Sequence, residues 1–211
     1  MTEDQPPVAA ASSSESAMPP LQLPPNLKFG PFSVASQVFH LSPSRLSYGL
    51  VNLKPLLPGH ILICPVRGVP RLSQLSGAET ADLFNTVRIV SVTLQRVYHA
   101  SAFNVAVQDG VDAGQSVPHV HVHVIPRQRG DYDDKGGGDR IYDAMDGEEG
   151  DLGKAFLEMR RRRGERSESG REALGGPDST REPRSEEEMR KEAEWLREEI
   201  EKDRSRAQDE E

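Results

Sequence analysis

Short apolar runs separated by turn residues predict β-strands between Val34 and Ile125. The runs end at Ser-Pro, Pro-Gly and glycine-containing segments, which are typical of turns. The predicted strands are residues 34–41, 46–52, 60–64, 103–108 and 119–125. Most of them are neighbours along the chain, so we expect an antiparallel sheet of about five strands.

One long amphipathic helix is predicted between the third and fourth strands, over residues 78–98. Ser76 followed three residues later by Glu79 forms a capping-box pattern at its start. Apolar residues then recur at intervals of three and four along one face: Leu83, Phe84, Val87, Val90, Leu94 and Val97. The sheet with this central helix indicates an α+β fold.

A second capping box, Ser185 and Glu188, begins a C-terminal helix over residues 184–203. Its apolar residues form a narrow stripe: Met189, Ala193, Leu196 and Ile200. A single helix with such a stripe needs a partner surface, so we expect it to pack on the core. Residues 204–211 are predicted to be an acidic tail.

Composition separates a core from its flanks. Residues 1–25 are rich in Pro, Ser and Ala and predict a disordered leader, and residues 148–183 predict a disordered charged linker. The domain between them, 26–147, contains 11 Lys and Arg residues against 10 Asp and Glu residues, so the flanks carry a net charge of -9 within the -8 of the whole chain. This balance argues against a nucleic-acid partner held by bulk electrostatics, but it permits a small anionic ligand.

The single cysteine, Cys64, excludes an internal disulfide and a cysteine-rich zinc module. The sequence contains neither a secretion-signal pattern nor an apolar run of about 20 residues, so no membrane association is expected. We expect an intracellular protein in the cytoplasm or also in the nucleus. Arg160–Arg163 resembles a weak nuclear signal, although a solvated linker explains this run as well.

Three histidines alternate with valines in the last predicted strand, at positions 119, 121 and 123. Side chains alternate across a strand, so the three imidazoles share one face at steps of about 6.8 Å. One interpretation is a polar strand face without further function. Another is a metal site, but the outer two Cα atoms lie roughly 13–14 Å apart, and neither a cysteine nor a clearly positioned carboxylate is available as a further ligand.

The third interpretation is nucleophilic catalysis. A neutral imidazole, with a pKa near 6.5, can attack phosphorus at physiological pH and form a phosphoramidate that water then cleaves. Neighbouring histidines can bind phosphate oxygens and transfer protons. The preceding loop, Gly114–Val117, can add backbone N–H groups and a hydroxyl.

The run His-Val-His-Val-His-Val-Ile at 119–125 matches the signature of the histidine triad superfamily. Further segments resemble its fragile histidine triad branch: Leu46–Asn52, Pro58–His60, Val107–Gly110, Ala113–Val117, Ile141-Tyr142 and Ser185–Met189. The resemblance covers residues 26–147 and the last helix. It implies the histidine-triad fold and hydrolysis of dinucleoside polyphosphates, with diadenosine triphosphate giving AMP and ADP.

The resemblance also implies roles for individual residues. The middle histidine, His121, would attack the α-phosphorus while a backbone carbonyl holds its other ring nitrogen. His123, together with His119, would bind phosphate oxygens. Gln108 would contact the bridging region of the substrate, and Asn52 the ribose. The phosphate chain would lie against Gly114, Gln115, Ser116 and Val117.

Other residues have two interpretations each. His60 either supports the triad from a neighbouring strand or is a structural histidine, and it is not included among the catalytic residues. Phe29, Leu50 and Leu62 are candidates for an apolar adenine slot or for ordinary core positions.

Alternative functions on the same site are a nucleoside phosphoramidate hydrolase and a nucleotide-binding signalling module with slow turnover. Pro126-Arg127 after the motif favours the polyphosphate hydrolase over the phosphoramidate hydrolase. No protein-bound cofactor or metal is expected, while Mg²⁺ or Mn²⁺ is expected to accompany the substrate. The family is typically a homodimer, which we also expect here.

Overall fold

The predicted antiparallel sheet is present and has five strands, in the order β3-β4-β5-β7-β6. The computed structural model describes residues 21–131, 133, 137–145 and 183–209. The strands, in chain order, are β3 Val38–Leu41, β4 Ser47–Val51, β5 Ile61–Pro65, β6 Ala102–Ala106 and β7 Val122–Arg127. All neighbouring pairs are antiparallel, so the expected α+β fold class is confirmed.

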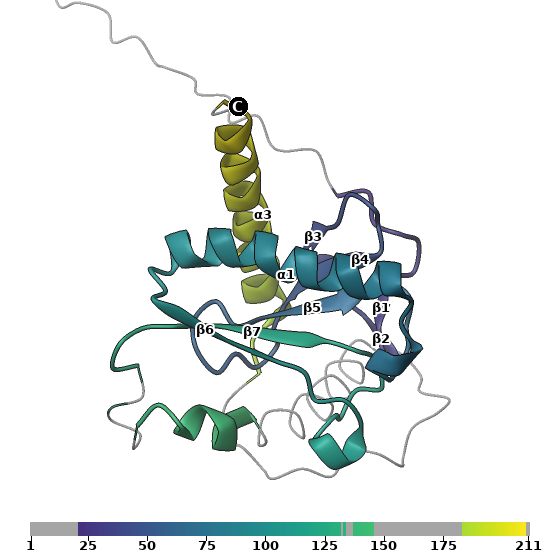
Figure 1. Cartoon of the computed structure of the whole chain (residues 1–211). Coiled ribbons are helices and arrows are strands. Elements are labelled where there is room, and N and C mark those ends of the chain that lie inside the picture. Colours follow the sequence, from purple (N-terminus) through teal and green to yellow (C-terminus); the bar gives the residue numbers. More distant parts are fainter. Residues whose placement is uncertain (1–20, 132, 134–136, 146–182, 210–211) are drawn as a thin grey trace, which may run out of the picture.

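The central helix α1, Gly77–Val97, lies across one face of this sheet (Figure 1). Its capping box is complete, because the Ser76 side chain accepts from the backbone N–H of Glu79 and the Glu79 carboxylate accepts from that of Ser76. Four residues of the predicted stripe are buried: Leu83, Val87, Val90 and Leu94. Phe84 differs from the prediction, since its side chain is 44% exposed.

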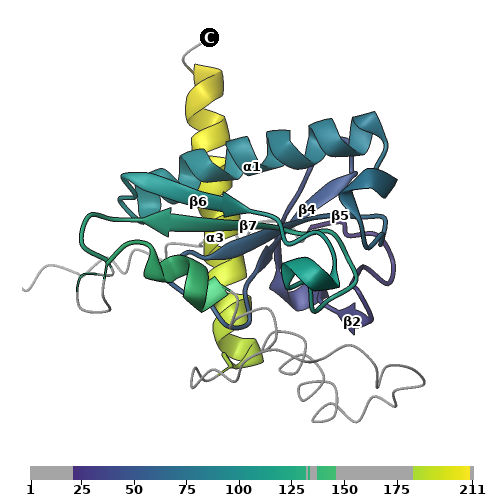
Figure 2. The same cartoon turned by 60° about the horizontal axis from the view of Figure 1, so that its bottom comes forward.

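The C-terminal helix α3, Glu186–Asp209, crosses α1 and packs on η1 (Ala35–Gln37), β3 and β4. Figure 2 shows it running along one side of the sheet and past α1. The apolar residues of the predicted stripe are all buried: Met189, Ala193, Leu196 and Ile200. These side chains belong to the same apolar core as α1 and the sheet.

Helix α3 is longer than the predicted 184–203 and includes most of the expected acidic tail. Arg204 pairs with Glu201 at 2.7 Å, and Arg206 with Asp203 at 3.5 Å. Such pairs one turn apart favour the helix where no Gly or Pro interrupts it.

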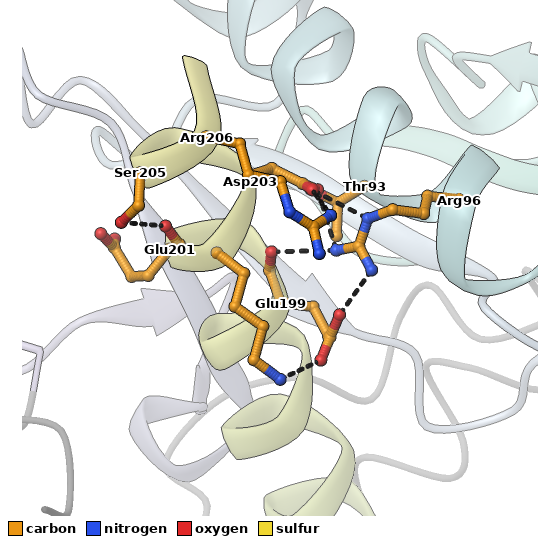
Figure 3. Close-up of polar contacts among 8 residues, drawn as sticks. Thr93, Arg96, Glu199, Glu201, Asp203, Ser205 and Arg206 are labelled. Carbon is orange, nitrogen blue, oxygen red and sulfur yellow. Dashed lines mark hydrogen bonds and ion pairs between the residues drawn. The ribbon is translucent and has the colours of Figure 1, made fainter. Parts of the chain in front are cut away.

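Polar side chains join α1 and α3 where the helices cross (Figure 3). Arg96 binds Glu199 at 2.7 Å and Asp203 at 2.8 Å, and Thr93 Oγ1 donates to Asp203 at 2.8 Å. Burial alone would raise the pKa of Asp203, but the hydrogen bonds from Arg96 and Thr93 outweigh it and the pKa is lowered. We call Thr93, Arg96, Glu199 and Asp203 the helix-crossing cluster.

Several predicted boundaries are corrected. The first strand begins at Val38 instead of Val34, because Ala35–Gln37 forms a 3-10 turn. The last strand begins at Val122 instead of His119, since the backbone of residues 119 and 120 bonds outside the sheet ladder. Leu21 and Leu23, in the predicted leader, pack partly buried against the core. The rest of that leader up to residue 20, and residues 148–182 of the predicted linker, lie outside the described residues.

A short hairpin precedes the sheet and consists of β1 (Lys28–Phe29) and β2 (Phe32–Ser33). Its turn contains Gly30 at φ +54°, and a Cβ there would lie 2.7 Å from Val117 Cγ1. The hairpin is thereby held against the loop before β7. In the part of the chain that the structure describes, no helix has the length and apolar character needed to cross a membrane.

Acidification from about pH 7 to about pH 5 is expected to destabilise the fold, because two buried histidines stay neutral in it. Burial lowers the pKa of His40 and His119 to about 4, whereas an unfolded chain binds this proton near 6.5. At a pH between these two pKa values, the unfolded state binds more protons than the folded state. Lowering the pH from about 7 to about 5 therefore reduces the free energy of unfolding by roughly 1–2 kcal/mol per histidine. His40→Leu should lose less stability than the parent when urea denaturation is compared at the two pH values.

His99→Asn provides the matched control for this measurement. His99 is exposed at the end of α1 with φ 51°, a backbone conformation that Asn adopts readily. It should retain the full acid sensitivity of the parent. An unchanged acid sensitivity in His40→Leu would contradict the explanation.

Candidate active site

The three histidines of the alternating run are buried side by side at the start of β7. His119 and His121 are 1% exposed and His123 is fully buried. The ring centroids of His121 and His123 lie 5.0 Å apart. Only His123 belongs to the strand, because Val120 donates its backbone N–H to Val69 and His119 donates to Val117. The row of histidines thus forms where the chain enters the sheet.

Both ring nitrogens of His119 bind backbone groups. Nδ1 accepts from the N–H of Gly30 at 3.0 Å, and Nε2 donates to the carbonyl oxygen of Pro65 at 2.8 Å. Burial lowers its pKa to about 4; the bond to Pro65 partly offsets this, and nearby His121 adds to it. The neutral ring therefore joins the β1–β2 hairpin to the end of β5. This placement makes His119 a positioning residue, and the phosphate contact predicted for it would need one of these two bonds to open.

His121 has a defined tautomer. Its Nδ1 lies 2.7 Å from the carbonyl oxygen of His119. A carbonyl oxygen only accepts, so Nδ1 bears the proton and Nε2 bears the lone pair. The ring of Phe29 packs edge-on against it, with centroids 5.1 Å apart. The middle histidine therefore has a nucleophilic nitrogen fixed at Nε2.

His123 has the opposite tautomer, which a chain of two hydrogen bonds determines. The backbone N–H of Leu56 donates to His60 Nδ1 at 3.1 Å, so the proton of the neutral His60 ring is on Nε2. His60 Nε2 then donates to His123 Nδ1 at 2.9 Å. Nε2 of a neutral His123 consequently bears a proton and can donate it in a hydrogen bond.

Asn52 lies beside this chain and is fully buried at the end of β4. Its Oδ1 accepts from the backbone N–H of Lys54 at 2.9 Å, and its Nδ2 lies 3.3 Å from His60 Nε2. The amide orientation is thus fixed by its own turn. The structure places Asn52 against His60, and the ribose contact predicted for it remains a prediction.

The loop before the histidines contains two glycines at positive φ. Gly114, at φ +91°, lies beneath Gln108, and a Cβ there would be 2.5 Å from Gln108 Nε2. Gln108 is 8% exposed, and its buried Oε1 has no hydrogen-bond partner among the described residues. Such an acceptor is available to a ligand, which fits the substrate contact predicted for Gln108.

Gln115 braces the same loop. Its Nε2 donates to the carbonyl oxygen of Pro70 at 3.0 Å and lies 3.5 Å from that of His119. Val117 is fully buried against Gly30, whereas Ser116 is partly exposed. Of the predicted phosphate-binding residues, the side chains of Gln115 and Val117 therefore hold the loop in place. Any contact they make with phosphate would come from the backbone.

The prediction from sequence missed one member of the site, His60, which it left out of the catalytic residues. The structure places its ring 5.2 Å from that of His123. The Pro-Gly-His pattern at the start of a strand was the available signal. Leu50 and Leu62 are fully buried core residues, while Phe29 contacts both His119 and His121.

The geometry does not favour the metal interpretation. Binding one ion to all three rings would require His119 to break one of its two bonds to backbone groups. Among the described residues, no group of three His, Cys, Asp or Glu side chains is arranged to hold a metal ion. The arrangement fits binding of an anionic group beside a neutral nucleophile.

Comparison with known proteins identifies related sequences. Residues 36–130 match the HIT domain family model. The asymmetrical bis(5'-nucleosyl)-tetraphosphatase of Schizosaccharomyces pombe is 45% identical over 177 residues, covering 83% of this chain and 94% of that protein. The bifunctional bis(5'-adenosyl)-triphosphatase/adenylylsulfatase FHIT of Arabidopsis thaliana is 46% identical over 140 residues, covering 66% and 74% respectively.

A solved structure shows the same fold. Plasmodium falciparum diadenosine triphosphate hydrolase, in complex with cyclomarin A, superposes with a TM-score of 0.58. The match covers 88% of this chain and 90% of that protein at 24% identity.

Gly114→Ala is expected to disturb Gln108 in addition to straining the backbone. Gly137 provides the control, because it has a similar φ of +102° but no atom of the described residues lies within 4 Å of a Cβ built there. Both variants should lose stability from the positive φ, and Gly114→Ala should lose roughly 1–3 kcal/mol more because of the contact with Gln108. Urea denaturation gives the difference, and the side-chain amide signals of Gln108 in nitrogen NMR should move only in Gly114→Ala. Equal losses in the two variants would show that Gln108 does not pack on Gly114.

Proposed function

Because this chain belongs to the HIT domain family, in its fragile histidine triad branch, we propose that it hydrolyses dinucleoside polyphosphates. The observation that carries the proposal is the bond from His121 Nδ1 to the carbonyl oxygen of His119, which leaves the lone pair on Nε2. A nucleotide substrate is supported by its relatives, one a bis(5'-nucleosyl)-tetraphosphatase and another a bis(5'-adenosyl)-triphosphatase. Diadenosine triphosphate, giving AMP and ADP, is the proposed substrate.

The first step forms a bond between His121 Nε2 and the α-phosphorus, and breaks the bond from that phosphorus to the bridging oxygen. ADP leaves from the triphosphate, and the AMP unit stays on the histidine as a phosphoramidate. The ring becomes positively charged as the new bond forms. The carbonyl oxygen of His119, 2.7 Å from Nδ1, stabilises this charge through the same hydrogen bond.

His123 assists this step as a hydrogen-bond donor. His60 donates a hydrogen bond to Nδ1 of His123, so the Nε2–H of His123 is available to an oxygen of the transferring phosphate. Gln108 presents its Oε1 near the glycine loop, where it can orient the water of the second step. That water loses a proton to solvent as it attacks phosphorus, the phosphorus–nitrogen bond breaks, and AMP and the neutral His121 are released.

Asn52 is proposed to contact the ribose, and Gly114–Val117 the phosphate chain. His119 is proposed to act indirectly, by holding the β1–β2 hairpin against the end of β5. Mg²⁺ or Mn²⁺ is proposed to accompany the substrate and to neutralise part of its phosphate charge. We propose that the protein is located in the cytoplasm and also in the nucleus. The acidic flanks and the family of the chain support this location.

A homodimer is proposed from apolar side chains that α1 and β6 leave exposed. Phe84 and Val92 lie two helical turns apart on α1 and are 44% and 55% exposed. Val105 is 47% exposed on β6, which is an edge strand of the sheet. Exposed apolar side chains beside an unpaired strand edge favour association with a second copy.

His121→Ala should abolish hydrolysis, lowering kcat by about four orders of magnitude, because no other group supplies the nucleophile. Diadenosine triphosphate and diadenosine tetraphosphate should each be incubated with the protein, with and without Mg²⁺, and the products separated by anion exchange. AMP with ADP, or AMP with ATP, is expected from the parent and from the surface control His99→Ala. Mass spectrometry of the parent should also detect protein that carries one AMP unit.

Other outcomes of this experiment reject the proposal. Inert polyphosphates with rapid cleavage of adenosine phosphoramidate would make the chain a phosphoramidate hydrolase. Tight binding of nucleotide without turnover of any substrate would make it a nucleotide-binding signalling module.

Phe84→Glu should convert the proposed dimer into a monomer, because it places a charge in the apolar contact. Light scattering after size exclusion measures the mass. Val111→Glu is the control, since Val111 is 73% exposed outside α1 and β6 and should leave the mass unchanged. A parent that is already monomeric at the highest concentration tested would refute the dimer.

A further inference from the structure

The segment from Asn52 to His60 connects β4 to β5 and holds two members of the site. Asn52 Oδ1 accepts from the N–H of Lys54, and the N–H of Leu56 donates to His60 Nδ1. The second bond decides which nitrogen of His60 bears the proton that it donates to His123. The conformation of this segment, which we call the support loop, therefore controls the donor that the triad presents.

Arg184 holds the first end of the support loop. Its Nε donates to the carbonyl oxygen of Asn52 at 3.0 Å, and its Nη2 donates to the same oxygen. The backbone N–H of Arg184 also donates to the carbonyl oxygen of Leu53 at 3.0 Å. Three hydrogen bonds thus join Arg184, two residues before α3, to the first two residues of the loop, although 132 positions separate Arg184 from Asn52.

Tyr98 holds the other end. Gly59, directly before His60, has φ +77°, and a Cβ there would lie 2.5 Å from Tyr98 Cε2. The tyrosine ring therefore packs against the loop backbone at the point where a side chain would not fit. Its other side contacts Trp195 of α3, with ring centroids 5.6 Å apart at 89°.

Glu192 of α3 joins these two contacts. Its Oε1 accepts from the hydroxyl of Tyr98 at 3.0 Å, and its Oε2 forms an ion pair with Nη1 of Arg184. The Arg184 and Glu192 side chains are only 20% and 16% exposed, so solvent screens this pair less than an ordinary surface pair. One carboxylate therefore fixes the groups at both ends of the support loop.

We propose that Arg184 and Glu192 are positioning residues for the reaction: through Tyr98 and the Asn52 carbonyl, α3 holds the support loop so that His60 donates to His123. The inference rests on the proposed function, because it concerns the activity of the same site. It assigns α3 a role in catalysis at a distance, in addition to its contribution to the core. Neither Arg184 nor Glu192 touches the reacting atoms.

The test compares three arginines of the α1 and α3 region, each changed to alanine in the full chain. Arg184→Ala removes the two side-chain hydrogen bonds to the carbonyl oxygen of Asn52. Arg96→Ala removes the ion pairs of the helix-crossing cluster, and so lowers stability through contacts with Glu199 and Asp203 that do not include the support loop. Arg190→Ala is the surface control, because Arg190 forms exposed ion pairs with Glu187 and Glu194 within α3.

We expect Arg184→Ala to lower kcat by about 10-fold or more, since small displacements of catalytic groups carry large rate penalties. Arg96→Ala should lower the melting temperature while keeping kcat, and Arg190→Ala should change neither. Nitrogen NMR of the histidine side chains gives a second readout. His60 should show the Nε2–H tautomer in the parent and in both controls, and a mixture of tautomers in Arg184→Ala.

Glu192→Gln keeps the size of the side chain but removes its charge. This variant tests the inference if Arg184→Ala does not fold. It should give a smaller loss of kcat and the same mixed signal from His60. Unchanged kcat and an unchanged His60 tautomer in a folded Arg184→Ala or Glu192→Gln would overturn the inference. So would an equal loss of kcat in Arg96→Ala, because α3 would then act through stability alone.

The failure of the proposed function would look different. A parent that cleaves no dinucleoside polyphosphate rejects the proposed function by itself. The tautomer of His60 would still be measured in such a protein, and a mixture in Arg184→Ala would still support the coupling between α3 and the triad.

Discussion

The hydrogen bond from His121 Nδ1 to the carbonyl oxygen of His119 is the contact on which the chemistry proposed for this molecule depends. An imidazole has two similar nitrogens, and only a partner of fixed polarity decides which one retains the lone pair. The carbonyl points at the ring because residues 117–121 leave the ladder of the sheet. Val120 bonds to Val69, and Gln115 contacts the same carbonyl oxygen. Three segments therefore maintain this orientation: β7, the glycine loop, and the segment that follows β5.

The three histidines of this row thus have three different arrangements of protons and hydrogen bonds on their ring nitrogens. His119 is occupied on both nitrogens by backbone groups, His121 retains a lone pair at Nε2, and His123 retains a proton there. The differences come entirely from partners, and most of these are backbone groups whose polarity cannot change. In the proposed reaction the nucleophile is a neutral imidazole, which needs no prior deprotonation. What the fold supplies is orientation.

Much of this fold was predictable from sequence, because apolar periodicity and capping residues act over a few positions. The helix that begins after Ser76, and the stripe Met189 to Ile200, follow such local rules. The alternation of His and Val identified the row of histidines, but it gave the wrong start of β7, since the partner of Val120 is 51 positions earlier at Val69. His60 was undervalued for the same reason. Its role depends on a contact with His123, 63 residues away, and the Pro-Gly-His pattern marks the residue without indicating that partner.

The C-terminal helix illustrates how one element can hold a core and a site through separate groups. Its apolar stripe and the helix-crossing cluster stabilise the contact with α1 and the sheet. Near the first turns of the same helix, Arg184 bonds to the backbone of the support loop, and Glu192 bonds to the side chains of Arg184 and Tyr98. A guanidinium fork on a carbonyl oxygen is directional, whereas apolar burial tolerates small shifts along the helix. The first kind of contact can therefore set the position of a catalytic group to a fraction of an ångström, and the second supplies the free energy that keeps the helix in place.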